Sequence, residues 1–242
     1  MPEGPAILHL RNQLKEFIGK KVKNAGGYGT MPTKWIEGKK LKDIITWGKH
    51  LLFIFKDGTV KIHLGLFGQI LINERRKANR KFYLEFANGE INGYVVRATK
   101  LEKNLKEIYD WRTDILSPSF SEKHVKELLK SQSEKEIGDV LMNQDIFSGV
   151  GNKIRNESLY LAGIHPLSIT GKIPSAKITQ LIKAVKKYAK QFYNELEKTG
   201  EHTTFNVYKL DHASDGSEVT MKILHKSKRK IYFSEHKQKL YK

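Results

Sequence analysis

The sequence of 242 residues contains no cysteine. Without thiols the chain can form no disulfide framework, no cysteine-ligated zinc or iron–sulfur centre and no cysteine nucleophile. Long apolar runs are also missing: no stretch reaches the roughly 18 apolar residues of a membrane helix, and no apolar leader precedes a small-residue cleavage site. We therefore expect no membrane partner and a location in the cytoplasm or nucleoid.

Proline is scarce, and acidic side chains are outnumbered by basic ones. The chain has 19 Gly, 6 Pro, no biased tract and 39% hydrophobic residues, a composition that can bury a core and argues against disorder. Its 26 Asp plus Glu stand against 44 Lys plus Arg, which gives a net charge of +18. This excess points to a polyanionic partner, because net charge bears on association and not on fold.

The first half of the sequence predicts a helix followed by an antiparallel sheet. Residues 4–18 carry apolar side chains at helical spacing. Between residues 21 and 98, short β-branched and aromatic runs flank the dipeptides Asp57-Gly58 and Asn88-Gly89, which are typical of two-residue hairpins. These patterns predict a β-sandwich or barrel led by a helix.

The second half predicts helices and a final hairpin. Ser119 and Glu122 resemble a capping box before a helical pattern, and a long helix follows around residues 178–192. Residues 218–224 and 231–233 read as two strands. The expected fold class is α+β, with an N-terminal sandwich domain over residues 1–112, a helical domain over 113–200 and a hairpin region over 201–242.

The N terminus combines an amine with a carboxylate. Pro2 is small enough that the initiator methionine is normally removed, which leaves a secondary amine. An α-amino group titrates near pH 8, about two units below a lysine, so a useful fraction is nucleophilic at neutral pH. Glu3 is suited to act as acid, base or electrostatic stabiliser. A simple helix entry with an acidic first turn explains the same residues.

Three further motifs carry groups suited to phosphate binding. Lys49 lies in Gly48-Lys49-His50-Leu51-Leu52 at the start of a strand, and a glycine-rich turn over 149–152 stands before a helix that contains Glu157. Glycines let a backbone approach a phosphate, and helix N-terminal amides donate to it. The tail 226–233 alternates basic and aromatic residues. A strand-edge lysine, a helix–helix turn and a solvated hairpin remain the ordinary alternatives.

Together and in this order, these motifs resemble the family of formamidopyrimidine-DNA glycosylase and endonuclease VIII, over nearly the whole chain. The resemblance also covers the strand and turn His63-Leu64-Gly65-Leu66-Phe67-Gly68, the stretch 144–152 and the closing segment 229–238. It implies a helix-two-turn-helix protein with a finger hairpin. The implied partner is double-stranded DNA with oxidised bases or abasic sites, bound in an interdomain cleft by a monomer that needs no cofactor.

The resemblance also implies a role for each motif. Pro2 would attack C1′ of the damaged nucleotide and carry a Schiff base, with Glu3 as general acid or base. The phosphates flanking the lesion would be held by Lys49, His63, Asn152 and Arg229. Leu66 and Phe67 would enter the stack left by the extruded nucleotide. For His63 a packed strand position, and for Leu66 and Phe67 a place in the sheet core, remain alternatives.

The sequence departs from the family pattern at two places. Ala6 stands where many relatives carry a second glutamate, which puts the efficiency of elimination in doubt. The usual four zinc cysteines of the finger are absent, and Ser234 and Lys237 occupy two of their positions. The nearby His212, His225 and His236 lack a regular ligand spacing. We expect a finger that holds no metal, of a zincless kind known in some members.

Lesion preference depends on the strand after Asn88-Gly89. The sequence there runs from Tyr94 to Lys100 and lacks the arginine-rich loop of the formamidopyrimidine branch, so the chain looks more like endonuclease VIII. The implied substrates are oxidised pyrimidines and abasic sites, with oxidised purines as the lesser possibility, and the strand would be cleaved by β- or β,δ-elimination. Arg97 suits either a substitute wedge residue or an exposed strand end. The alternative function is a lesion- or abasic-site-binding protein with weakened or lost catalysis.

Overall fold

A computed structural model describes residues 2–224 and 228–242, which form two compact units. The first unit holds Pro2 and residues 6–109, and the second holds residues 3–5 and 110–242. The expected subdivision at residue 200 remains a prediction. None of the helices in the described ranges is long and apolar enough to cross a membrane.

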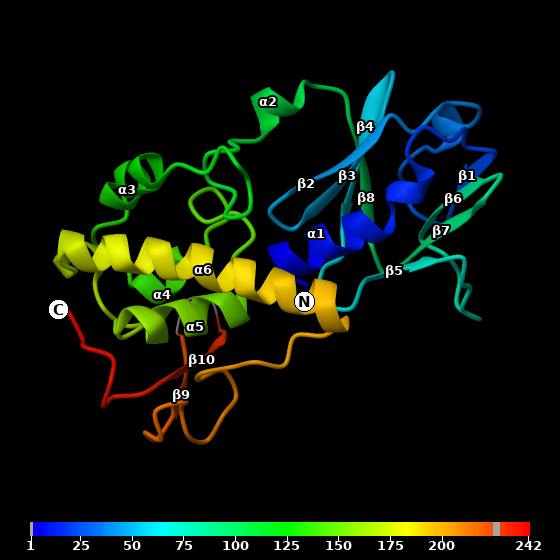
Figure 1. The fold of residues 1–242 in the computed structure, drawn as a ribbon. Helices are drawn as coiled ribbons and strands as arrows, with labels where there is room; N and C mark the ends of the chain where they lie inside the picture. The colour runs from blue at the N-terminus through cyan, green and yellow to red at the C-terminus, as the bar shows by residue number, and fades with distance from the viewer. Residues whose placement is uncertain (1, 225–227) are drawn as a thin grey trace. The chain divides into compact units, whose positions relative to one another are not determined.

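The first unit contains two four-stranded antiparallel sheets (Figure 1). One sheet has the order β2-β3-β4-β8 and the other β1-β6-β7-β5. The strands are β1 (Asn24–Gly26), β2 (Asp43–Trp47), β3 (His50–Phe55), β4 (Gly58–His63), β5 (Gln69–Ile72), β6 (Phe82–Phe86), β7 (Gly89–Tyr94) and β8 (Arg97–Leu101). The two predicted hairpins are confirmed, since β3 pairs with β4 and β6 with β7, but each loop begins one residue earlier than predicted, because Gly58 pairs with Phe55 and Gly89 with Phe86.

The core of this unit joins both sheets to the first helix. Helix α1 (Gly4–Gln13) contributes Ile7, and the cluster continues through Phe53 on one sheet and Leu84 on the other. Short helical turns η1 (Lys15–Phe17), η2 (Lys34–Ile36) and α2 (Leu105–Ile108) complete the unit. Burial of large apolar side chains between two sheets is the sandwich packing that the alternating strands predict.

Two predicted details of the helices are wrong. Helix α1 ends at Gln13 and not at residue 18, because the Leu14 amide is shared between the carbonyls of Leu10 and Arg11 and the chain tightens into η1. The predicted capping box at Ser119 is also absent. Ser121 caps α3 (Glu122–Lys130) by accepting from the His124 amide, since Ser119 belongs to the preceding turn.

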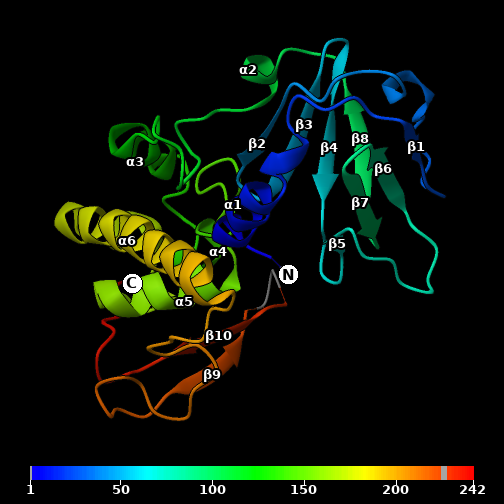
Figure 2. The same ribbon diagram turned by 45° about the vertical axis from the view of Figure 1, so that its right-hand side comes forward.

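The second unit is built around helix α5 (Asn152–Ala162), of which residues 154–160 are buried. The 25-residue helix α6 (Ser175–Thr199) lies along it (Figures 1 and 2). The predicted final hairpin is confirmed as β9 (Thr220–Ile223) paired with β10 (Lys230–Phe233). The second unit also contains the short helix α4 (Ile137–Val140) and the turn η3 (Thr170–Lys172).

Candidate nucleic-acid interface and catalytic terminus

The Glu3 side chain is bound at the N terminus of α5. Its carboxylate accepts hydrogen bonds from the amides of Gly151 (3.1 Å), Lys153 (2.8 Å) and Ile154 (3.1 Å). Glu3 itself is buried. Amides at a helix start point outward, and the helix dipole adds positive potential there, so this setting stabilises a negative charge. Of the three roles open to Glu3, the contacts favour electrostatic stabilisation.

The glycine-rich turn before α5 makes this contact sterically feasible. A Cβ atom on Gly151 would lie 2.6 Å from Glu3 Oε1, so only glycine leaves room for the carboxylate. Gly149 has a φ of 97°, and its carbonyl accepts from the Gly4 amide at 2.9 Å. The turn therefore fixes residues 3 and 4, and with them the peptide bond to Pro2.

Asn152 and the basic end of the final hairpin come together at the same helix start. The Asn152 side-chain amide donates to the Lys230 carbonyl at 3.2 Å, and Arg155 donates to that carbonyl at 2.9 Å. Burial lowers the pKa of Arg155 to about 10. Arg229 and Lys230 are exposed. Lys226 and Ser227 of the predicted basic strand, like His225, lie outside the described residues.

Helix α5 also anchors the segment that leads to the hairpin, by means of a residue whose role the sequence did not reveal. The Glu157 carboxylate accepts four N–H groups, from the Asn206 amide (2.9 Å), the Asn206 side chain (2.8 Å), Val207 (3.0 Å) and Tyr208 (2.8 Å). The preceding residue, Asn156, accepts from the Tyr232 amide at 2.9 Å. Two buried polar side chains thus tie residues 206–208 and β10 to α5.

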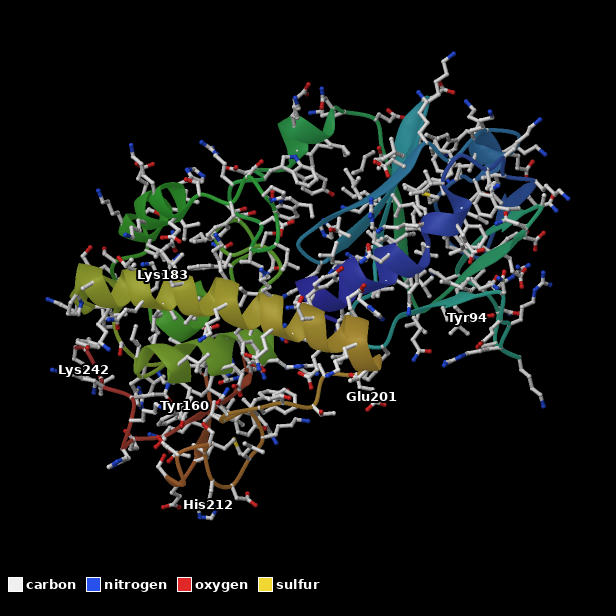
Figure 3. All side chains as sticks on the ribbon, in the orientation of Figure 1. Tyr94, Tyr160, Lys183, Glu201, His212 and Lys242 are labelled. Carbon is white, nitrogen blue, oxygen red and sulfur yellow. The ribbon has the colours of Figure 1, made fainter. Side chains whose placement is uncertain are left out.

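The hairpin region has its own polar and apolar contacts at the expected finger positions. Ser234 is buried, its hydroxyl lies 2.8 Å from the Ser217 hydroxyl, and its amide donates to Gln238 at 3.0 Å. Gln238 in turn donates to the Ile164 carbonyl at 2.8 Å. Tyr160 points from α5 toward this region (Figure 3) and packs with Val207.

In the first unit the expected phosphate contacts lie at one end of the β3–β4 ladder. Lys49 precedes β3 and is buried, so it is not an exposed strand-edge lysine. His50 lies opposite His63, with ring centroids 5.5 Å apart. Burial, then Lys61, His63 and Lys49, lower the pKa of His50 to about 4. Burial and then Lys49, Arg97 and Lys61 also lower the pKa of His63.

Leu66 and Phe67 lie on the surface, so the sheet-core alternative is wrong for both. Leu66 is 62% exposed and Phe67 76% exposed. They belong to the connection between β4 and β5, in which Gly65 has a φ of 59° and its amide donates to His63 Nδ1 at 3.1 Å. Arg97, at the start of β8, is exposed as well. Large apolar side chains held open to solvent are typical of contact surfaces.

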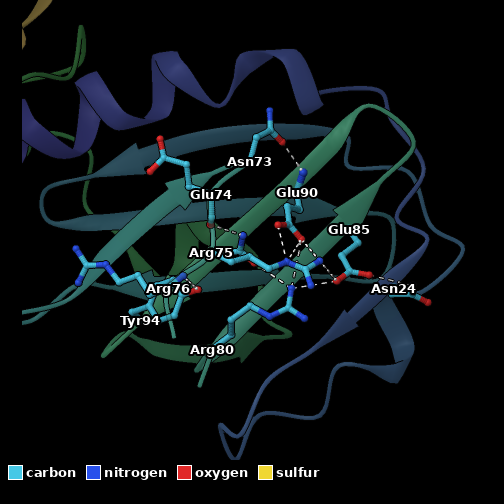
Figure 4. A network of polar contacts seen from close by, with 10 residues as sticks. Asn24, Asn73, Glu74, Arg75, Arg76, Arg80, Glu85, Glu90 and Tyr94 are labelled. Carbon is cyan, nitrogen blue, oxygen red and sulfur yellow. Dashed lines mark hydrogen bonds and ion pairs between the residues drawn. The ribbon is translucent and has the colours of Figure 1, made fainter. Parts of the chain in front are cut away.

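A charged network in the first unit is a second feature that sequence reasoning missed (Figure 4). Glu85 and Glu90 face each other across β6 and β7, where two like charges would repel. Arg75 donates to Glu90 at 2.7 Å and Arg80 to Glu85 at 3.0 Å, and the hydrogen bonds from Arg75 lower the pKa of Glu90. A turn centred on Asn88-Gly89 would pair Glu90 with Ala87, so the predicted turn position concealed the pairing of Glu85 with Glu90.

Each unit therefore holds part of the predicted site. The first unit carries Pro2, Lys49, His63, Leu66 and Phe67, and the second carries Glu3, Asn152 and Arg229. Within the second unit the predicted residues Glu3 and Asn152 meet at the start of α5.

Two family models match the chain. Residues 1–99 match the formamidopyrimidine-DNA glycosylase N-terminal domain, and residues 113–202 match the formamidopyrimidine-DNA glycosylase H2TH domain. Endonuclease 8-like 3 of Mus musculus is 28% identical, over 98% of this chain and 41% of that protein. Formamidopyrimidine-DNA glycosylase of Solibacter usitatus is 24% identical, over 76% of this chain and 74% of that protein. The chain thus spans about two fifths of the mouse relative.

Solved structures share the fold. A viral DNA glycosylase superposes with a TM-score of 0.85 at 18% identity, over 98% of this chain and all of that chain. The formamidopyrimidine-DNA glycosylase of Lactococcus lactis, solved with DNA that contains an abasic site, gives a TM-score of 0.83 at 20% identity, over 98% and 99% of the two chains.

Proposed function

Because the chain belongs to the formamidopyrimidine-DNA glycosylase and endonuclease VIII family, we propose that it is a bifunctional DNA glycosylase and abasic-site lyase of base excision repair. The relatives are named as glycosylases or endonucleases, and the Lactococcus lactis structure holds abasic-site DNA. The observation that best supports the proposal is the Glu3 carboxylate on the amides of α5, one peptide bond from Pro2.

The proposed reaction starts at the Pro2 nitrogen once Met1 has been removed. Its lone pair forms a bond to C1′, the C1′–N bond to the base breaks, and the departing base takes up a proton. The proline nitrogen then loses its N–H proton and O4′ gains one as the sugar ring opens, which leaves an iminium ion that acidifies the 2′ proton. Loss of that proton expels the 3′ phosphate. The negative charge of Glu3 stabilises the cationic iminium, in keeping with a carboxylate held by three amides.

The remaining predicted residues are assigned to DNA binding. Lys49, His63, Asn152 and Arg229 contact phosphates, and the net charge of +18 supports a polyanionic partner. Leu66 and Phe67 fill the stack after nucleotide extrusion, since both side chains are exposed. Oxidised pyrimidines are the proposed substrates.

The hairpin of β9 and β10 serves as a zincless finger in this proposal. Ser234, which stands at one of the usual cysteine positions, forms hydrogen bonds with Ser217 and Gln238. Phe233, Ile231 and Leu224 form a small apolar cluster beside it. Packing and hydrogen bonds of this kind support a hairpin without a metal ion.

Borohydride trapping on a duplex with a single abasic site tests the proposal. We expect a covalent adduct that peptide mapping assigns to the Pro2 nitrogen, and none from protein that retains Met1, because an amide nitrogen cannot attack C1′. Tight binding without an adduct would instead support the lesion-binding alternative, which the alanine at position 6 motivates. A panel of duplexes with thymine glycol, dihydrouracil or an oxidised guanine then measures base release and strand-end chemistry.

A further inference from the structure

A hollow of about 530 Å³ opens on the first unit beside the proposed wedge residues. Its lining includes Tyr28, His63, Lys81, Val95 and Arg97, all of which belong to this unit. The proposed reaction assigns no role to Tyr28, Lys81 or Val95.

The strand registers place this hollow at the corner that carries Leu66 and Phe67. His63 at the end of β4 pairs with Arg97 at the start of β8, and Gln69 at the start of β5 pairs with Tyr94 at the end of β7. The connections 64–68 and 95–96 therefore cross between the two sheets side by side. A base displaced by Leu66 or Phe67 would emerge next to the hollow.

Tyr28 is held at the hollow by its backbone. Its amide donates to the Arg80 carbonyl at 3.2 Å, and the Gly29 amide donates to the Lys81 carbonyl at 3.1 Å. A Cβ atom on Gly27 would lie 2.7 Å from the Phe82 nitrogen, so this approach requires glycine. The network of Figure 4 fixes Arg80 in turn.

The Tyr28 ring is placed to stack with a further planar group. It is 58% exposed, and Lys81 Nζ lies 4.4 Å from its centroid. An exposed ring with a cation beside it suits a nucleobase and its phosphate, because every base has a π face and phosphates attract lysine.

Val95 adds an apolar edge in a strained conformation. Its φ is 55°, which β-branched residues rarely adopt, and its side chain is 63% exposed. Strain of this kind persists where the surrounding structure enforces it, and it is concentrated at functional positions.

We propose that this hollow binds the nucleobase opposite the lesion, after that base has lost its partner, by stacking it on Tyr28 with Lys81 on the adjoining phosphate. The inference rests on the proposed function, because it requires a damaged duplex as ligand. It makes Tyr28 a determinant of the preference for the base opposite the lesion.

The test compares two duplexes that both carry a tetrahydrofuran abasic analogue. In one the opposite position holds 2-aminopurine, and in the other it holds a second analogue with no base. We expect wild-type protein to bind the first about 5- to 150-fold more tightly, the range for stacking one base on an aromatic side chain, and to quench 2-aminopurine fluorescence. Tyr28→Ala should bring the affinity ratio close to one and leave the fluorescence unquenched, whereas Tyr28→Phe should retain both effects.

Tyr241→Ala is the matched control, since Tyr241 in the second unit also has a lysine over its ring, Lys239 at 5.5 Å. It should preserve the ratio and the quenching. A Tyr28→Ala protein that keeps the affinity ratio and the quenching would overturn the inference. It would also be overturned if Lys81→Ala weakened binding of both duplexes equally while Tyr28→Ala had no effect. Failure of the proposed function has a different readout, namely absence of the borohydride adduct, because this binding test requires no catalysis.

Discussion

The contact between Glu3 and α5 predicts that a single methyl group at Gly151 disables the site without altering any reacting residue. Gly151 has a φ of −121°, which alanine adopts without strain, so Gly151→Ala acts only through crowding. The added carbon would lie 2.6 Å from Glu3 Oε1 and force the carboxylate off the three amides.

The expected cost follows from the bonds that are lost. Hydrogen bonds to a charged group contribute about 1.5–3 kcal/mol each, and a carboxylate at a helix start adds up to about 2 kcal/mol. The three bonds share one carboxylate, and water replaces part of what the amides lose. We therefore expect Gly151→Ala to lower the free energy of unfolding by about 2–4 kcal/mol and to reduce borohydride trapping at least about tenfold.

Urea unfolding and hydrogen exchange at the Gly151, Lys153 and Ile154 amides provide the measurement. The double variant Gly151→Ala with Glu3→Asp is the control, because the shorter carboxylate makes room for the methyl group and should recover part of the stability. A loss below about 0.5 kcal/mol with unchanged protection of the three amides would refute the reasoning.

Four other outcomes are expected. The pKa of His50 is about 4 in the folded chain against 6.5 ordinarily, so the unfolded chain binds the extra proton. The contribution of His50 to the free energy of unfolding is therefore fully present above pH 6.5 and falls by up to about 3 kcal/mol as the pH drops toward 4. Urea titrations at several pH values should show a flatter pH dependence for His50→Gln. Glu157→Gln should lower the free energy of unfolding by about 2–5 kcal/mol, because a side-chain NH₂ then faces amide donors. An unchanged Tm in thermal unfolding would contradict a stabilising role for these four hydrogen bonds. Arg229→Ala should lower the slope of log affinity for DNA against log salt by about one, while exposed Lys34→Ala leaves it unchanged, and equal slopes would exclude a phosphate contact by Arg229. Treatment with EDTA should change neither Tm nor DNA affinity, and a drop in either would show that the hairpin holds a metal.

Local patterns predicted the fold well where the deciding interaction is local. The dipeptides Asp57-Gly58 and Asn88-Gly89 located both hairpins because short hairpin turns favour such residues, although each loop begins one residue before its dipeptide. The start of α3 was misplaced by two residues, since Ser119 and Ser121 are both suitable caps and only the preceding turn selects between them.

The candidate site was predictable as a set of residue types but not as an arrangement. Glu3 and Gly151 are 148 residues apart in sequence, and no periodicity signals that a carboxylate at one will meet an amide at the other. The buried roles of Glu157 and Arg155 were missed for a related reason. Charged residues in a helix normally face solvent, and here that expectation fails because α5 is covered by later parts of the chain.

The convergence of distant segments on α5 has a consequence for the order of events during synthesis. Residues 6–109 can pair their strands while the ribosome is still producing the second unit, because all eight strands of the two sheets lie within that stretch. Glu3 has no docking place until Ile154 has emerged, and the segment 206–208 must follow before Glu157 is satisfied. Residues 3–5 therefore stay undocked while the sheets form, even though Ile7, four residues after Glu3, already belongs to the core of those sheets.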